Sequence, residues 1–201
     1  FINELEQAGV TCYERVSGRK MPRQTPRYDG IKVGERLIGV PFETPDLQRM
    51  WQFFAGAVIP ADQTKGFFTD MHAALGDFQM HFGAGGIHGS VNNETFRSDD
   101  DYVVWDWDVT SYYPSLAIVN RWYPEHLGEE FCDIYADLKQ QRVGFAKGTP
   151  ENAMLKLALN GVYGDSNNKY SPFYDPAYTM AITINGQMLL AWLAELLWTQ
   201  V

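Results

Sequence analysis

Two carboxylates, Asp106 and Asp108, stand two residues apart in the sequence YVVWDWDV. The β-branched and aromatic residues around them predict a strand over residues 102–109, and side chains two apart on a strand project from the same face. The strand is followed by a turn and then by Pro114, where a helix is expected to begin. A carboxylate at a strand end, beside free backbone amides, is suited to holding Mg²⁺ next to a phosphate. Asp108 is therefore the first candidate for chemistry.

A second set of polar residues falls on a helix predicted over Pro150–Tyr163. Lys156 and Asn160 are four residues apart and share one face of that helix, and Tyr163 follows three residues later. A lysine, an amide and a phenol on one stripe could bind a triphosphate and contact a base. An ordinary solvated helix face gives the same spacing, so neither set is decisive alone.

Together, the two sets resemble two motifs of the family B DNA polymerases. Residues 108–116, DVTSYYPSL, are similar to motif A (D-x-x-S-L-Y-P-S), and residues 156–164, KLALNGVYG, are similar to motif B (K-x-x-x-N-S-x-Y-G). Residues 83–90, GAGGIHGS, resemble the Gly-Gly element that precedes motif A in phage-type members. The resemblance covers residues 82–198 and implies a viral or phage-type DNA-directed DNA polymerase.

The resemblance also implies a role for each matching residue in template-dependent deoxynucleotidyl transfer. Asp108 would be the catalytic aspartate that binds both Mg²⁺ ions, with the backbone of Val109 as a further metal ligand. Ser111 and Tyr112 would present backbone amides to the nucleotide phosphates, and Tyr113 would pack against the sugar. Such chemistry depends on positioning and on neutralising charge, so the site needs metal carboxylates and cations more than a nucleophile.

Other matching residues are implied to bind the nucleotide or the DNA. They are Arg142, Lys156 and Asn160 for the triphosphate, Tyr163 and Gly164 for the nascent base pair, and Gly85 and Gly86 for the template. The implied partners are primer-template DNA, a deoxynucleoside triphosphate and the remaining polymerase segments, with no membrane. We expect Lys156, Asn160 and Arg142 to line one face of a two-helix hairpin and their side chains to converge there.

The sequence departs from the family pattern at several positions. Tyr112 replaces the usual leucine of motif A, and Gly161 replaces the serine of motif B. Phe82 and one extra residue stand where the Gly-Gly element has a tyrosine. A motif C sequence, which carries the second metal aspartate, does not occur, so we expect the 201 residues alone to bind metal weakly and to catalyse poorly or not at all.

The helices and strands predicted around these residues indicate an α+β fold. The resemblance implies a partial polymerase palm, an antiparallel sheet with packed helices, joined to a helical-hairpin fingers. The expected divisions are an N-terminal region at 1–91 with a basic, exposed loop at 15–36, a palm part with motif A at 92–128, fingers with motif B at 129–170, and a palm helix at 171–201 that leads towards the absent motif C.

Periodicity and helix-end signals predict further elements along the chain. Strands are expected over 37–42 and 102–109, and helices from Pro45 onward and over 69–80, 115–121, 129–145, 150–163 with Gly164 as C-cap, and 177–198. The last helix is apolar but carries Asn185, Gln187 and Glu195, which favours a core helix over a membrane span. The expected core includes Val103, Val104, Leu116, Leu157, Leu189 and Leu193.

Charge is distributed unevenly along the chain. The 25 acidic and 16 basic side chains give a net charge of −9. Residues 92–137 carry 11 acidic and 2 basic side chains, whereas residues 138–170 have a net charge of +3 and residues 15–36 a net charge of +5. An acidic centre between basic segments suits a divalent metal between phosphates, although solvated surface charge gives the same pattern.

Composition and chain ends limit the class of protein. The chain has 45% hydrophobic and 20% charged residues, and this composition excludes a disordered, collagen-like or coiled-coil protein. Cys12 and Cys132 are far apart without a CxxC pair, which favours two reduced thiols. The chain begins at Phe1 without a secretory leader, so we expect a piece of a longer cytoplasmic protein, in the host cell if the source is a virus.

Two other functions remain open. The chain could be a polymerase-derived module that binds nucleotides or nucleic acid without catalysis of its own. It could also be a metal-dependent or two-carboxylate hydrolase that uses Asp106 and Asp108. The hydrolase is disfavoured because carboxylates two residues apart on a strand are too close to flank a scissile bond from opposite sides.

Overall fold

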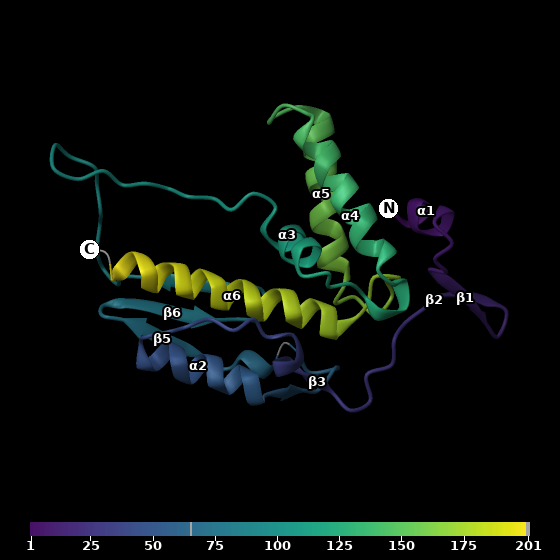
Figure 1. Cartoon of the computed structure of the whole chain (residues 1–201), viewed down its shortest axis with the longest axis horizontal. Helices are drawn as coiled ribbons and strands as arrows, with labels where there is room; N and C mark the ends of the chain where they lie inside the picture. The colour runs from purple at the N-terminus through teal and green to yellow at the C-terminus, as the bar shows by residue number, and fades with distance from the viewer. Residues whose placement is uncertain (65, 200–201) are drawn as a thin grey trace.

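The computed structural model of the protein describes residues 1–64 and 66–199. One long helix, α6 (Pro176–Trp198), runs through the middle of the molecule, with other elements on both sides of it (Figure 1). In this described part of the chain, six helices and three small antiparallel sheets form a mixed α+β fold. The α+β class predicted from the sequence is therefore confirmed.

Three helices lie on one side of α6 (Figure 1). They are α3 (Tyr112–Val119), α4 (Glu130–Val143) and α5 (Pro150–Asp165), with the short α1 (Ile2–Gln7) against α4. α4 and α5 pack against each other as a hairpin, and the buried Tyr135 hydroxyl of α4 donates to the Leu159 carbonyl of α5 at 2.6 Å. Gly164 lies inside α5 and is not its C-cap, because the helix continues to Asp165 and is capped by Ser166, whose hydroxyl donates to the Tyr163 carbonyl.

The other side of α6 is covered by α2 (Pro45–Gly56) and by β-structure. This β-structure consists of β3 (Ile31–Lys32), paired with β4 (Val58–Ile59), and of a sheet of β5 (His72–Leu75), β6 (Phe78–Phe82) and β7 (Ile87–Ser90). The described chain also contains the 3₁₀ turns η1 (Val33–Arg36), η2 (Gly66–Phe68) and η3 (Glu125–Leu127). Two apolar clusters result, one around α4 and α5 and one around α2 and β5–β7, and α6 contributes to both.

The helix predicted over residues 69–80 is wrong, because this segment forms the hairpin of β5 and β6. Gly76 and Asp77 make the two-residue turn, in which Gly76 has φ +55°, the positive value that glycine supplies at the first turn position. Burial alternates along the strands, with Ala73, Leu75 and Met80 buried. The period of the apolar residues is therefore two and not that of a helix.

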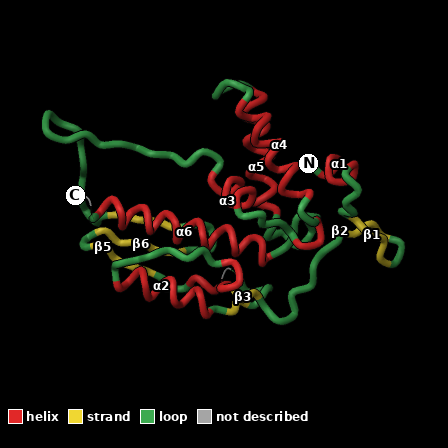
Figure 2. Tube along the Cα trace, in the orientation of Figure 1, coloured by secondary structure: helices red, strands yellow, loops and turns green. Residues whose placement is uncertain are grey.

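The strand predicted over residues 102–109 is also wrong. The long segment between β7 and α3 has no regular secondary structure (Figure 2). A strand needs a neighbour to pair its backbone groups, and none lies beside this segment in the described ranges. Its side chains are consequently exposed, among them Trp107 at 85%. The strand predicted over 37–42 is likewise irregular chain, held against α6 by the side-chain bonds described below.

Several predicted core residues lie at the surface, for related reasons. Val103 and Val104 are exposed because their segment is unpaired, while Leu157 (74% exposed) and Leu193 face solvent on their helices. Leu116 is buried and Leu189 is partly buried against the core, as predicted.

The basic segment 15–36 is more ordered than the loop predicted there. It begins in a hairpin of β1 (Tyr13–Val16) and β2 (Arg19–Pro22) and ends in β3 and η1. Most of its side chains are exposed, but that of Arg27 is only 19% exposed.

Three buried polar side chains connect α6 to segments without regular structure. Asn185 accepts a hydrogen bond from Ile38 N and donates to the Arg36 carbonyl, at 2.7 and 2.9 Å. Gln187 accepts from Gly83 N at 2.9 Å, and the Glu195 carboxylate accepts from the backbone amides of residues 43 and 44. α6 is long and apolar enough to span a membrane, but 61% of its apolar window is buried inside the protein, which agrees with the core helix predicted from these same polar residues.

The two leucines of α5 provide a matched test of this core. Leu159→Ala removes a fully buried side chain and should lower the free energy of unfolding by about 2–5 kcal/mol, as large-to-small core substitutions do. Leu157→Ala, two residues earlier on an exposed face, should change it by less than about 0.5 kcal/mol. Urea unfolding of both variants measures the difference, and equal losses would contradict the packing described here.

Candidate nucleotide-binding site

An unusual backbone conformation at Ser111 brings the motif A-like segment against the α4–α5 hairpin. Ser111 has φ 50° and ψ 49°, a left-handed conformation that residues other than glycine rarely adopt. Its carbonyl accepts hydrogen bonds from both the backbone amide and the hydroxyl of Ser115, each at 2.8 Å. The chain therefore turns sharply into α3. Strained residues of this kind are concentrated at functional sites.

A cavity of about 290 Å³ lies between this turn and the hairpin. Its lining residues are Asp108, Thr110 and Ser111 from the turn, Lys139, Arg142 and Val143 from α4, Phe145 and Lys147 from the connection, and Asn152 and Lys156 from α5. Arg142 Nη1 donates to the Ser111 hydroxyl at 2.7 Å. The Asn152 amide donates to the carbonyls of Arg142 and Phe145 at 3.2 and 2.9 Å. These bonds fix the connection between α4 and α5.

The electrostatics of this cavity favour a polyanion. Four cationic side chains line it, together with the single carboxylate of Asp108. Arg142 is partly buried and Lys156 is exposed, so one cation is held in place while the other is free to reach a ligand. Of the three side chains predicted to converge, those of Arg142 and Lys156 share the cavity wall. Asn160 does not line the cavity, because it lies one helical turn further along α5, and its side chain is exposed.

An aromatic cluster adjoins the same turn. The Tyr113 ring lies 4.4 Å from the Tyr163 ring, measured between centroids, and 5.8 Å from the Tyr112 ring. The Tyr163 hydroxyl is 2.7 Å from the Thr183 hydroxyl on α6. Burial raises the pKa of Tyr163 to about 12, against a smaller lowering by the hydrogen bond with Thr183, and burial also raises the pKa of Tyr113. Both phenols therefore stay neutral at physiological pH.

The glycine turn before β7 contacts the first turn of α3. The Tyr113 hydroxyl donates to the Gly85 carbonyl at 2.9 Å, and a Cβ added at Gly86 would lie 3.1 Å from the Tyr113 oxygen. The structure thus brings Gly85, Gly86, Tyr113 and Tyr163 together, although they are far apart in the sequence. Gly164 is exposed on α5 beside Tyr163.

The carboxylates do not form a complete metal site. Asp106 and Asp108 are both exposed, as is Val109. Within residues 1–64 and 66–199, no group of three or more His, Cys, Asp or Glu side chains could hold a metal ion. A single exposed carboxylate does not fit the two-ion site that the resemblance implies, so we assign no step of metal chemistry to these residues.

Sequence reasoning missed three of the polar residues in the cavity wall, Lys139, Lys147 and Asn152. Lys139 lies three residues before Arg142 on one helix face, and the net charge of +3 over residues 138–170 was the available signal. The role of Asn152 depends on how the hairpin closes, which a local pattern does not specify.

The Tyr113 contact allows a test by hydrogen exchange. Tyr113→Phe keeps the ring beside Tyr163 but removes the bond to Gly85, which is worth about 1 kcal/mol. The amide of Gly86, which donates within this turn to Gly83, should exchange roughly fivefold faster. Tyr112→Phe is the control, because its hydroxyl donates to Gly186 on α6 and should leave the Gly86 amide unaffected. Equal exchange in both variants would refute the contact.

Comparison of the chain with protein-family models, with characterised proteins and with solved structures gives no match.

Proposed function

We propose that this chain forms the nucleotide-binding part of a DNA-directed DNA polymerase of the family B type. The observation that carries the proposal is the cavity in which the motif A-like turn, with Asp108 and Ser111, meets four cationic side chains of the α4–α5 hairpin. Sequence segments that resemble two motifs of one family thereby line one site. The proposal places the protein in the cytoplasm, in the host cell if the source is a virus.

In this proposal the chain binds and orients a deoxynucleoside triphosphate. Arg142 and Lys156 neutralise the triphosphate, helped by Lys139 and Lys147, because charge-assisted hydrogen bonds to phosphate are strong. Tyr113 supports the sugar from the adjoining aromatic cluster, and its position is fixed by Gly85 and Tyr163. Charge neutralisation by Mg²⁺ would require carboxylates from other segments of the polymerase besides Asp108.

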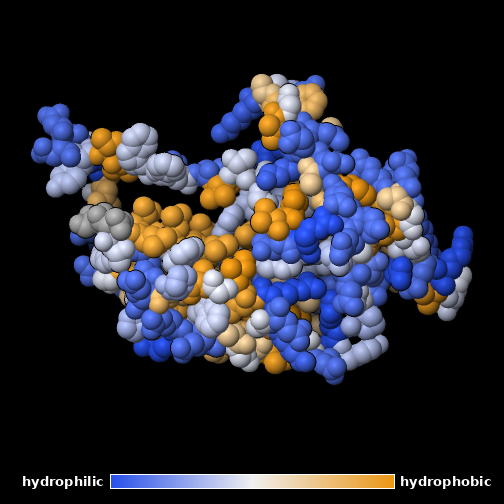
Figure 3. All heavy atoms as spheres, viewed as in Figure 1, coloured by the Kyte–Doolittle hydropathy of each residue, from blue (hydrophilic) through white to orange (hydrophobic). Residues whose placement is uncertain are grey.

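The proposal needs a second metal carboxylate from elsewhere in the parent polymerase. The unpaired segment at residues 102–109 carries exposed apolar side chains. The C-terminal end of α6 carries others, including Leu197 and Trp198, and apolar surface is visible there (Figure 3). Exposed apolar surfaces of this kind mark interaction sites. We assign this surface to the remaining polymerase segments, and primer-template DNA would then lie across the completed site.

One observation favours a second candidate, a binding module without catalysis of its own. Asp108 is the single carboxylate in the wall of the cavity, whereas nucleotidyl transfer by two metal ions uses more than one. Both candidates predict nucleotide binding, and they differ in whether any longer form of the protein extends a primer.

Nucleotide binding is tested with Lys156→Ala. Loss of one charge-assisted phosphate contact should weaken the affinity for a deoxynucleoside triphosphate by about 1.5–3 kcal/mol, or roughly 10- to 150-fold. Lys169→Ala is the matched control, because Lys169 is exposed and lies outside the cavity wall. Isothermal titration calorimetry in low salt compares the variants. Equal triphosphate affinities of the Lys156→Ala and Lys169→Ala variants would show that this cavity is not the nucleotide-binding site.

Catalysis is tested by primer extension with Mg²⁺. The 201 residues alone should show no extension, because one exposed carboxylate gives a hydrated Mg²⁺ ion little reason to lose water. A form of the protein that adds a second metal aspartate should extend the primer, and Asp108→Asn should abolish that activity. Extension by the 201 residues that disappears in Asp108→Asn would reveal a second metal ligand within them. Failure of every longer form would favour the binding module.

A further inference from the structure

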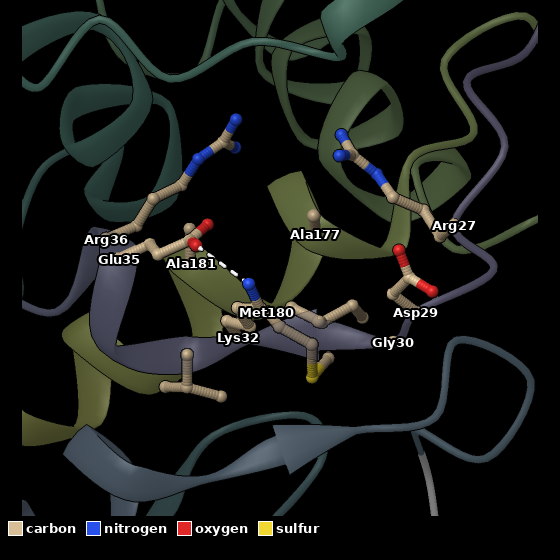
Figure 4. Close-up of a pocket in the computed structure, with 11 residues that line it drawn as sticks. Arg27, Asp29, Gly30, Lys32, Glu35, Arg36, Ala177, Met180 and Ala181 are labelled. Atoms are coloured by element: carbon tan, nitrogen blue, oxygen red, sulfur yellow. Dashed lines mark ion pairs between the residues drawn. The ribbon is translucent and has the colours of Figure 1, made fainter.

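A second cavity lies on another part of the molecule, between the segment that contains β3 and η1 and the first turns of α6 (Figure 4). Its volume is about 220 Å³. Ala177, Met180 and Ala181 form its α6 wall, and Arg27 and Arg36 stand on either side of the first turn of that helix (Figure 4). None of its lining residues belongs to the candidate nucleotide-binding site.

Arg27 is held rigidly at one side of this cavity. Its Nε and Nη2 donate to the two carboxylate oxygens of the buried Asp175, at 3.1 and 2.6 Å. Its Nη1 lies 2.9 Å from the Glu125 carboxylate. Burial alone would lower the pKa of Arg27, but hydrogen bonding and charge from Asp175 outweigh that effect and raise the pKa. Arg27 is therefore held in one position, and its charge is offset by the carboxylates of Asp175 and Glu125.

Arg36 is fixed at the other side through its main chain. Its carbonyl accepts from the amide of Asn185, which is 1% exposed and also bonds to Ile38 N and to the Ala181 carbonyl. The Arg36 Nη1 atom is buried, yet it has no hydrogen-bond acceptor among residues 1–64 and 66–199. A buried donor on a charged group is costly to leave unpaired, so the structure calls for an acceptor at this atom.

The carboxylates of the cavity do not supply that acceptor. Glu35, the neighbour of Arg36, instead lies 3.7 Å from the Lys32 ammonium, as the dashed line in Figure 4 marks. Asp29 lines the side nearer Arg27, and it makes no ion pair with Arg36 in the described chain. The lining thus holds three cations and two carboxylates, and its one buried unpaired polar atom is cationic.

We propose that this cavity binds a phosphate group, with Arg36 as the principal donor and the exposed Lys32 as a further cation. The planar guanidinium matches phosphate oxygens in geometry, and Asn185 holds the main chain of Arg36 in place before any ligand arrives. The cavity is several times larger than the roughly 30 Å³ that one water occupies in the liquid, so a phosphate group fits.

The phosphate could belong to a nucleic-acid backbone or to a small molecule. The segment 15–36 carries seven basic side chains, and the exposed ones on β1 and β2 precede Arg27 along the chain. A strand with repeated phosphates could contact several of these cations, which a free phosphate could not. The backbone of a nucleic acid is therefore the favoured source.

The experiment is a residue-specific NMR titration of the whole 201-residue chain. The backbone amides of Lys32 and Ala181 report on this cavity while inorganic phosphate is added in one arm and a single-stranded oligonucleotide without terminal phosphate in the other. Both ligands should shift these signals in the unmodified protein. Arg36→Gln should weaken both responses at least tenfold, the loss expected for one charge-assisted hydrogen bond.

Arg49→Gln is the matched control, because it removes one exposed arginine charge from α2 outside the cavity wall. It should leave both titrations unchanged within twofold, and Arg36→Lys should give an intermediate affinity if the fork geometry matters. A response to phosphate alone would support the cavity and assign it to a small molecule. Absence of any response at Lys32 and Ala181, or equal effects of Arg36→Gln and Arg49→Gln, would overturn the proposal.

Lys156→Ala separates this proposal from the proposed function. It should weaken triphosphate binding in the α4–α5 cavity by roughly 10- to 150-fold and leave the phosphate response of Ala181 intact. Either site can therefore fail in these measurements while the other is retained.

Discussion

The fold depends on one constraint. Chain segments without regular secondary structure need hydrogen-bond partners for their buried backbone amides, and side chains of the single buried helix α6 supply them. Asn185, Gln187 and Glu195 meet this need by accepting from amides of residues 38, 83, 43 and 44. Each is almost completely buried, where an unpaired polar group would cost several kcal/mol. These bonds fix the order in which the irregular segments run along α6, and both apolar clusters are built on that order.

The two candidate sites use the same design, in which an arginine is positioned by a residue from a distant part of the chain. Ser111 receives the Arg142 guanidinium in one site, while Asn185 holds the Arg36 main chain in the other. The first contact orients the guanidinium itself, whereas the second fixes the main chain from which the Arg36 side chain extends, and neither contact neutralises the charge. Preorganised cations of this kind bind phosphate with little further loss of conformational entropy.

Much of the helical framework was predictable, because local signals define it. Proline at the first position marks α2, α5 and α6, and apolar spacing gives their lengths closely. The strand predicted at 102–109 failed because pairing needs a neighbour that composition does not reveal. The β5–β6 hairpin was missed because Met71, Leu75 and Phe78 fit helical spacing, although the Gly76-Asp77 turn was a readable signal. Arg142 and Lys156 of the nucleotide-binding site were predictable from the motifs, whereas Arg36 of the second cavity was not, because its main chain is held by Asn185, 149 residues away.

The unpaired segment between β7 and α3 has a consequence for the integrity of the molecule. Exposed, irregular chain of this length is where proteases cut first. A single cut there would leave α2 and β5–β7 on one piece and α6 on the other (Figure 1). The shared apolar cluster and the Gln187 and Glu195 bonds would still join the pieces, so the nicked protein would remain one particle and separate only under denaturing conditions. The protein is in this sense already built as two interlocking halves, either of which could be supplied as a separate polypeptide.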